Sequence, residues 1–461
     1  MKPTTPSRIS SLIPSAKSTA ILVLILLAAT IFTWRVLHDQ FFTETDLSVW
    51  QRDWMELEIC NKKVQSFCTS ISKYPFAYLL NSGAANLLAG RTHIDQWWGG
   101  LRNASTTLNS AACAIALLAA TCTATLREKV SILIYCLALL LTPIPDFYIM
   151  SGSLEIQSGI FFSLFALYAH RITKSASSNA TPIYKAALPL FLGCLYKDTY
   201  SIIWILTGLA TWAITLKQRE KIGDTKANRL IYLSLATLSG GWAAFVVGLG
   251  FNRYRYVSIT PAAYLQESAQ TRPDAIQSLK FLLASIFSPN GGILSFWGLA
   301  LSALTIIILV RGSLKLTEFI FASSFPVICL VMHSLWWAPF GWDAWGNRLL
   351  IPSMMFTLAA LSLHVPEEHK PNRTKKSSIR PTIRLLTTVA LTSVIVFSSG
   401  YIIKPFESNK KALWESNLYA HASCQAMSSL LNDIKPTEHH LIWKSKIYYD
   451  CAHERFWSKT Q

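Results

Sequence analysis

Residues 184–216 read YKAALPLFLGCLYKDTYSIIWILTGLATWAITL, and the way this stretch crosses a membrane decides the fold. Its 33 residues are too few for two full spans of about 20 residues and too many for one upright span. The polar residues Lys197 and Asp198 lie near its middle. Two interpretations are therefore open: a single crossing, or a hairpin of two short helices.

The basic residues along the chain choose between these interpretations. A single crossing puts the five bases of residues 217–229 outside, whereas a hairpin puts every basic loop on the side of the N-terminus. Cytoplasmic loops collect Lys and Arg, so we predict the hairpin, with the N-terminus inside and the C-terminus outside. The basic positions that then share one side are Arg127, Lys129, Arg171, Lys174, Lys185, residues 217–229, Arg311, Lys315 and residues 370–384.

The composition of the whole chain is that of a membrane protein. Of its 461 residues, 51% are hydrophobic and only 15% are charged, against roughly 25% in an average soluble protein. Recurring uncharged runs predict an all-α, polytopic transmembrane helix bundle of about eleven membrane segments, and they exclude a soluble enzyme, a disordered chain and a single-anchor receptor. The runs are 18–34, 103–126, 130–145, 156–169, 199–216, 230–252, 281–310, 319–342, 349–366 and 385–403.

The same topology explains the net charge of +17. In a soluble protein, so large a positive charge would suggest a nucleic-acid partner. Here the basic residues cluster between hydrophobic spans and form no continuous patch, so we expect no nucleic-acid binding.

We divide the chain into two parts. Residues 1–403 form the transmembrane domain, and residues 404–461 form a small extracytoplasmic C-terminal segment. The first outer loop, 38–102, carries apolar residues such as Trp50 and Trp54 near helical spacing. This spacing predicts amphipathic helices that lie on the outer surface of the membrane.

Four of the nine cysteines fall in the predicted outer segments. An oxidising exterior such as the periplasm would allow the disulfides Cys60–Cys68 and Cys424–Cys451. Pairing between the two regions remains an alternative. The spacing matches no CxxC zinc site.

The predicted outer half of the membrane domain gathers charged residues of both signs around apolar helices. Arg and Lys can hold a phosphate, and an aspartate nearby can act as a general base toward a hydroxyl group. This combination suits a ligand with an anionic head and a lipid tail. The carboxylates are Asp46, Asp146 and Glu155, and the cations are Lys197, Arg253, Arg255 and Arg348.

Three stretches of the chain resemble segments of the GT-C superfamily, which comprises polytopic membrane glycosyltransferases that use polyprenyl-phosphate-linked sugars. FSPNGGILSF (287–296) resembles a loop that precedes a late helix, and FGWDAWGNRLLIP (340–352) resembles a Trp- and Gly-rich outer loop that ends in Arg. GCLYKDTY (193–200) is similar to a Gly-x-x-x-Lys segment that joins two short helices. The resemblance is to bacterial mannosyltransferase- and arabinosyltransferase-like members, and it spans roughly residues 40–365.

The resemblance implies an activity and a set of residue roles. Asp46 occupies the position of the catalytic carboxylate, just after the first helix. It would deprotonate an acceptor hydroxyl, which attacks the anomeric carbon with inversion while polyprenyl phosphate leaves. Lys197, Arg348 and either Arg253 or Arg255 would neutralise the departing phosphate.

The resemblance also bears on cofactors, partners and location. No cofactor is certain. Some members place a divalent ion beside the phosphate, and here Glu155 or Asp146 would serve Mg²⁺ or Mn²⁺. The donor would be a polyprenyl-phosphate sugar in the inner (plasma) membrane, used on the periplasmic side, and the acceptor a lipid, a glycan or a protein. The alternative is a transporter or flippase of a lipid-linked saccharide, which should carry its polar residues near the bilayer midplane.

Overall fold

The computed structural model describes the central, helical part of the chain. The described residues are 114–142 without 119, 154–174, 183–256, 272–287, 292–311, 316–336 and 347–365, together with residue 111 and six positions between 20 and 27. This part is all helical and contains no strand. The predicted all-α class is therefore confirmed for the described residues.

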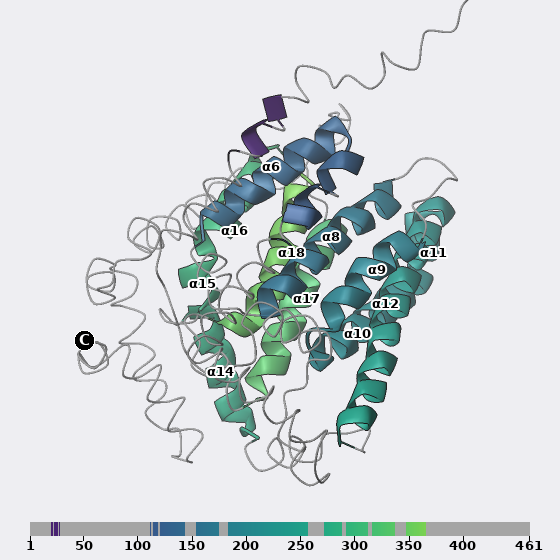
Figure 1. Ribbon diagram of the computed structural model, residues 1–461, viewed down its shortest axis with the longest axis vertical. Coiled ribbons are helices and arrows are strands. Elements are labelled where there is room, and N and C mark those ends of the chain that lie inside the picture. The colour runs from purple at the N-terminus through teal and green to yellow at the C-terminus, as the bar shows by residue number, and fades with distance from the viewer. Residues whose placement is uncertain are drawn as a thin grey trace, which may run out of the picture.

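The helices of this region pack into one bundle (Figure 1). Helix α8 packs on α9 and α18, whereas α12 packs on both α9 and α10. In chain order the elements are α6 (Leu126–Leu140), α8 (Leu154–Lys174), α9 (Ile183–Cys194), α10 (Asp198–Lys217), α11 (Arg219–Ile222), α12 (Asp224–Tyr256), α14 (Ala275–Phe287), α15 (Ile293–Phe296), α16 (Gly298–Arg311), α17 (Leu316–Ser334), the 3₁₀ helix η4 (Arg348–Leu350) and α18 (Ile351–Ser362).

Helices α9 and α10 form a hairpin. A Cβ atom added at Gly240 of α12 would lie 2.7 Å from the carbonyl oxygen of Ala187, in the middle of α9. At the next residue, Gly241, it would lie 3.2 Å from the carbonyl oxygen of Ser201, in α10. One straight helix would separate residues 187 and 201 by about 21 Å, so the chain must turn back between them.

The arms of this hairpin are unequal. Helix α9 has 12 residues, with Pro189 inside it, and α10 has 20. The prediction of two short helices is therefore right for α9 and wrong for α10, which by length and composition is able to cross a membrane.

Helix α12 is longer than the apolar run 230–252 predicted. It has 33 residues and extends through Asp224 at one end and Tyr256 at the other. Arg253 and Arg255 therefore lie on a helix, beyond the end of the uncharged run 230–252. Counting uncharged residues places a helix end too early, because charged side chains are tolerated where a helix leaves the hydrocarbon. At the other end, Gly223 turns the chain from α11 into α12 with a φ of 80°, which glycine adopts without strain.

The uncharged run 281–310 is also not one helix. Helix α14 ends at Phe287, and α15 begins at Ile293 after Gly292. Pro289 and Gly291, which disfavour a continuous helix, fall between the two in the sequence and outside the described residues.

An aromatic cluster forms the core where α8, α10, α17 and α18 meet. Trp204 of α10 is fully buried, and its ring centroid lies 4.4 Å from that of Phe325, 5.1 Å from that of Phe165 and 5.2 Å from that of Phe356. Phe162 packs at 5.5 Å from the same ring. Most of these pairs are tilted or edge-to-face, the geometry that aromatic rings prefer. The cluster therefore fixes four helices relative to one another.

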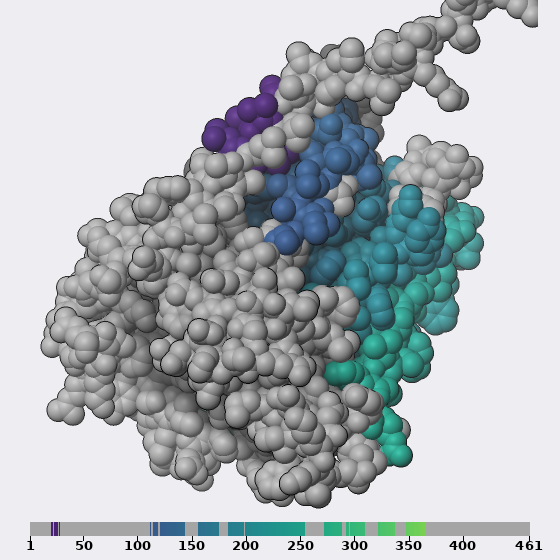
Figure 2. Space-filling model, viewed as in Figure 1, coloured from purple at the N-terminus to yellow at the C-terminus, as the bar shows by residue number. Residues whose placement is uncertain are grey.

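The outer surface of α9, α10 and α12 is apolar. These helices form the teal-to-green side of the molecule in Figure 2. Large hydrophobic side chains on them are 41–65% exposed: Tyr184, Leu188, Ile202, Leu206, Leu209, Trp212, Ile214, Leu216, Tyr232, Leu235, Trp242, Val246 and Val247. Two described helical stretches, Thr199–Lys217 and Asp224–Arg253, are long and apolar enough to cross a membrane. An exposed apolar surface of this extent is compatible with membrane association.

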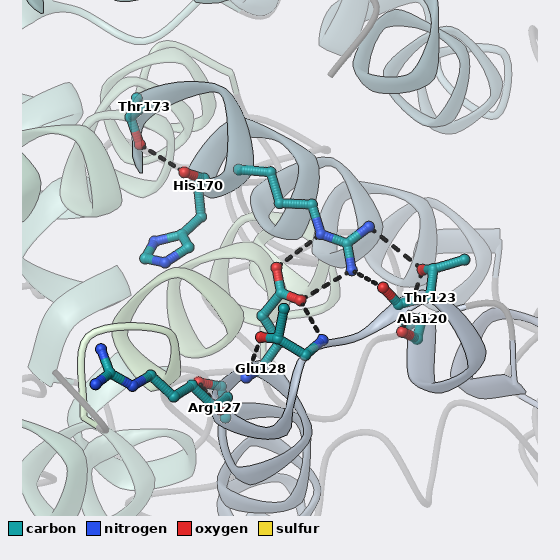
Figure 3. A network of polar contacts seen from close by, with 9 residues as sticks. Ala120, Thr123, Arg127, Glu128, His170 and Thr173 are labelled. Atoms are coloured by element: carbon teal, nitrogen blue, oxygen red, sulfur yellow. Dashed lines mark hydrogen bonds and ion pairs between the residues drawn. The ribbon is translucent and has the colours of Figure 1, made fainter. Parts of the chain in front are cut away.

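Several basic segments meet at one end of the bundle, which we call the basic end. Arg171, near the end of α8, bonds Glu128 at the start of α6, and a guanidinium nitrogen of Arg229, in α12, donates a 3.3 Å hydrogen bond to the carbonyl oxygen of Thr173. Figure 3 shows Glu128 and Thr123 beside the α8 segment that carries His170 and Thr173. The His170 ring also lies against that of His364, with centroids 5.4 Å apart.

Candidate functional site

Three of the predicted site residues meet at the opposite end of α8. The ammonium nitrogen of Lys197 lies 3.8 Å from Oε1 of Glu155, and Nε of Arg348 lies 3.9 Å from the same oxygen. Their side chains are only 10–20% exposed. We call Glu155, Lys197 and Arg348 the ion cluster.

Each member of the ion cluster lies at the beginning of a helical element. Glu155 is in the first turn of α8, Lys197 is the N-cap of α10, and Arg348 opens η4, which leads into α18. A carboxylate in a first helical turn is stabilised by the helix dipole. Lys197 makes no side-chain capping bond with its own helix, and its ammonium group instead reaches across to Glu155.

The backbone around the cluster is fixed by buried contacts. The hydroxyl of Ser158, one turn after Glu155, donates a 3.0 Å hydrogen bond to the carbonyl oxygen of Gly193 at the end of α9. A Cβ atom at Gly193 would lie 2.6 Å from the ring of Phe162, so only glycine lets α9 approach α8 this closely. These contacts hold the hairpin turn, and with it Lys197, beside the start of α8.

Tyr200 links the hairpin to Arg348. Its hydroxyl donates a 3.4 Å hydrogen bond to the carbonyl oxygen of Leu349, and its ring centroid lies 5.8 Å from the ammonium nitrogen of Lys197. The ring is fully buried and packs against Phe162 and Phe325 of the aromatic cluster. The aromatic core therefore forms a rigid support for both cations.

The electrostatics of the cluster favour an anion. Two cations share one carboxylate, so the three side chains carry a net formal charge of +1. Both N–O distances exceed the 2.7–3.2 Å of a direct hydrogen bond, so these two contacts are ion pairs without a direct hydrogen bond. The positive ends of the helix dipoles at the starts of α8 and α10 add to the same field. A phosphate would complete the cluster with charge-assisted hydrogen bonds.

Glu155 is poorly suited to hold a metal ion. Its carboxylate faces two cations, which would repel a divalent ion. No group of three or more His, Cys, Asp or Glu side chains that could bind a metal occurs among the residues that the structure describes. Asp146, the other predicted metal ligand, lies outside them.

The remaining predicted site residues are not part of the described cluster. Arg253 is exposed near the end of α12. Asp46, the side chain of Arg255, and Cys60, Cys68, Cys424 and Cys451 lie outside the described structure, so their roles stay predictions.

Two buried polar residues near the cluster escaped the sequence analysis. His333, at the end of α17, is 6% exposed, and Asn347, directly before Arg348, is 2% exposed. A single histidine in an apolar run gives no periodic signal, and its position relative to Arg348 depends on tertiary packing. Asn347 is next to Arg348 in the sequence, but its burial also depends on that packing.

Comparisons with known proteins give no further guide. No family model matches the chain, and neither a curated protein nor a solved structure matches it significantly. The function must therefore be inferred from the residues and their geometry.

Proposed function

We propose that this protein is an integral membrane glycosyltransferase that moves a sugar from a polyprenyl-phosphate donor to a hydroxyl acceptor. The observation that carries the proposal is the convergence of Lys197 and Arg348 on one carboxylate at one end of an apolar bundle. Cations in this position bind an anionic head while the lipid tail stays among the exposed apolar helices.

The proposed topology follows from the two ends of the bundle. We place the basic end in the cytoplasm, as the positive-inside rule requires, and the ion cluster at the periplasmic face of the inner membrane. With this orientation the chain has about eleven membrane segments, an inner N-terminus and an outer C-terminus. An ion cluster at one end of α8, away from the midplane, fits chemistry at one surface better than passage through the membrane.

The proposed reaction is a single displacement. An acceptor oxygen forms a bond to the anomeric carbon while the bond from that carbon to the phosphate oxygen breaks, and Asp46 takes the acceptor proton. The negative charge that stays on the polyprenyl phosphate is stabilised by Lys197 and Arg348, which are held in place before the reaction begins. Arg253 and Arg255, near the end of α12, would assist if the donor head reaches them.

Label transfer tests this proposal. The purified protein is incubated with radiolabelled polyprenyl-phosphate sugars and membrane extract, and transfer is compared between wild type, Lys197→Gln, Arg348→Gln and Asp46→Asn. We expect each variant to lose at least about two orders of magnitude in rate. Removing one group that stabilises developing charge costs about 10²–10³, and removing a general base costs about 10²–10⁴. Lys217→Gln and Arg127→Gln remove exposed cations away from the cluster and should retain wild-type transfer.

Two outcomes would contradict the proposal. Transfer that survives Asp46→Asn removes this residue from its role as general base. An absence of transfer from every donor, combined with movement of a lipid-linked saccharide across proteoliposomes that Lys197→Gln abolishes, identifies a flippase.

A further inference from the structure

His333 lies at the height of the ion cluster. Phe325 of α17 packs on Trp204 of α10 at 4.4 Å and on Tyr200 at 6.1 Å. From Phe325 to His333 is two helical turns, about 12 Å, and from Trp204 to Lys197 is about 10 Å. Cys329 and His333 follow Phe325 at intervals of four residues, so all three lie on one face of α17, and this face leads from the aromatic cluster toward the end of the bundle that carries Lys197.

Helix α18 gives the same height for His333 independently. The hydroxyl of Thr357 donates a 2.9 Å hydrogen bond to the carbonyl oxygen of Ala322, and the ring centroids of Phe356 and Phe325 lie 5.8 Å apart. The two helices are therefore antiparallel: a step toward the start of α18 corresponds to a step toward the end of α17. Continuing by about eight residues from Phe325 and Phe356, toward the end of α17 and the start of α18, brings His333 level with Arg348.

His333 and Asn347 use only part of their hydrogen-bonding capacity within the described part of the chain. Neither ring nitrogen of His333 has a hydrogen-bond partner among the described residues, although the side chain is 94% buried. Oδ1 of Asn347 also has none, while its amide nitrogen lies 3.5 Å from the hydroxyl of Ser285. Buried polar atoms without partners destabilise the folded protein, because they have lost their bonds to water. Such atoms beside a cluster of charges indicate a ligand that supplies the missing partners.

We propose that His333 and Asn347 bind the hydroxyl groups of the sugar, next to the phosphate held by Lys197 and Arg348. A neutral imidazole offers one donor and one acceptor, and an amide oxygen offers an acceptor. These groups match sugar hydroxyls, each of which both donates and accepts. The cations, in contrast, match the phosphate. The inference rests on the proposed function and divides its site into a phosphate half and a sugar half.

Binding of two lipids that differ only in the sugar tests this division. The probes are a polyprenyl monophosphate and, with the same chain, the polyprenyl-phosphate hexose or pentose that wild type binds most tightly, measured in nanodiscs by native mass spectrometry. We expect His333→Ala to weaken binding of the glycosylated lipid about tenfold and that of the plain phosphate less than twofold. Asn347→Ala should have the same selectivity with a smaller effect. His333→Gln, which keeps a donor and an acceptor, should recover part of the loss.

The controls separate this inference from the proposed function. Lys197→Gln should weaken both lipids alike, and His364→Ala, at the basic end, should weaken neither. If His333→Ala and His333→Gln weaken the binding of both lipids equally, or if neither variant weakens it, the assignment of His333 and Asn347 to the sugar is overturned. If wild type binds neither lipid, the proposed function itself is overturned. Thermal unfolding of each variant confirms that it folds.

Discussion

The guanidinium of Arg171 holds both carboxylate oxygens of Glu128, with Nε 2.7 Å from Oε1 and a terminal nitrogen 3.1 Å from Oε2. The same guanidinium donates to the hydroxyl and the carbonyl oxygen of Thr123. Glu128 also completes a capping box, because it accepts a 2.7 Å hydrogen bond from the backbone of Thr125. The carboxylate of Glu128 thus caps the start of α6 and links this helix to the end of α8.

Glu128→Gln should destabilise the protein by about 1–3 kcal/mol. The substitution removes the charge from a bidentate pair, and hydrogen bonds to charged groups contribute about 1.5–3 kcal/mol. The midpoint of thermal unfolding in detergent measures the effect. Glu220→Gln, at an exposed position of α11, removes the same charge and should leave the midpoint unchanged. Equal midpoints for the two variants would show that the pair does not stabilise the bundle.

The stability of the protein should fall at acidic pH in a way that depends on Glu128. This residue precedes the uncharged run 130–145. Burial raises its pKa, but hydrogen bonds from Arg171 and Thr125 and the charge of Arg171 outweigh burial, so the net shift is downward. A lowered folded-state pKa gives stability that is fully present above the unfolded value of about 4.3 and is lost as the pH falls through the folded value. Unfolding midpoints from pH 7 to pH 3 should therefore decline less steeply in Glu128→Gln than in wild type.

Gly193→Ala should damage both stability and the ion cluster. The added methyl group would lie 2.6 Å from the ring of Phe162, which is fully buried among other aromatic rings and has no space to move. Overpacking of this kind costs about 1–3 kcal/mol, and any shift of α9 displaces Lys197. Gly250→Ala is the matched control, because a methyl group there meets nothing within 4 Å. A Gly193→Ala variant with wild-type stability and lipid binding would refute the close packing of α8 and α9.

Glu155→Gln should tighten the binding of a polyprenyl monophosphate by about threefold or more. The carboxylate competes with a phosphate for Lys197 and Arg348, and its neutral isostere does not. The measurement is lipid binding in nanodiscs, with Glu220→Gln as the control for a lost negative charge. Weaker binding in Glu155→Gln would show that the carboxylate is needed to position the cations.

Cysteine labelling should place the two ends of the bundle on opposite sides of the membrane. In a chain whose own cysteines are replaced, Lys221→Cys on α11 should react with a membrane-impermeant maleimide only from the cytoplasmic side. Asp274→Cys, just before α14, should react only from the periplasmic side; both positions are exposed. The reverse pattern would put the ion cluster in the cytoplasm and remove the basis for a periplasmic transferase.

The fold could be predicted from sequence where apolar runs and charge agree. The basic residues of 217–229 predicted the hairpin, because only a hairpin puts them on the same side as the other basic segments. In the structure Arg229 does donate a hydrogen bond to the carbonyl oxygen of Thr173 at the basic end. The limits of α12 and the division of 281–310 could not be read in this way. Helix ends depend on dipoles and on local glycine and proline residues. A count of uncharged residues, in contrast, indicates only the part of a helix that can lie in the hydrocarbon layer.

The site could be predicted in part for a similar reason. Glu155, Lys197 and Arg348 stand out in the sequence because charged residues beside apolar helices are rare. Their pairing could not be predicted, because the partner of Lys197 in the described ion pair, Glu155, is 42 residues away in the sequence. The Thr125–Glu128 capping box was readable from its spacing. The link from Glu128 to Arg171, and the position of His333, arise only when helices distant in sequence pack together.

The length of α12 creates a mismatch with any ordinary bilayer. Its 33 residues extend for about 50 Å, whereas the hydrocarbon layer is about 30 Å thick. In the proposed topology the helix must therefore tilt or protrude, and the end that carries Arg253 would emerge among the lipid headgroups. There, α12 would offer incoming lipids a first point of electrostatic capture before they reach the ion cluster.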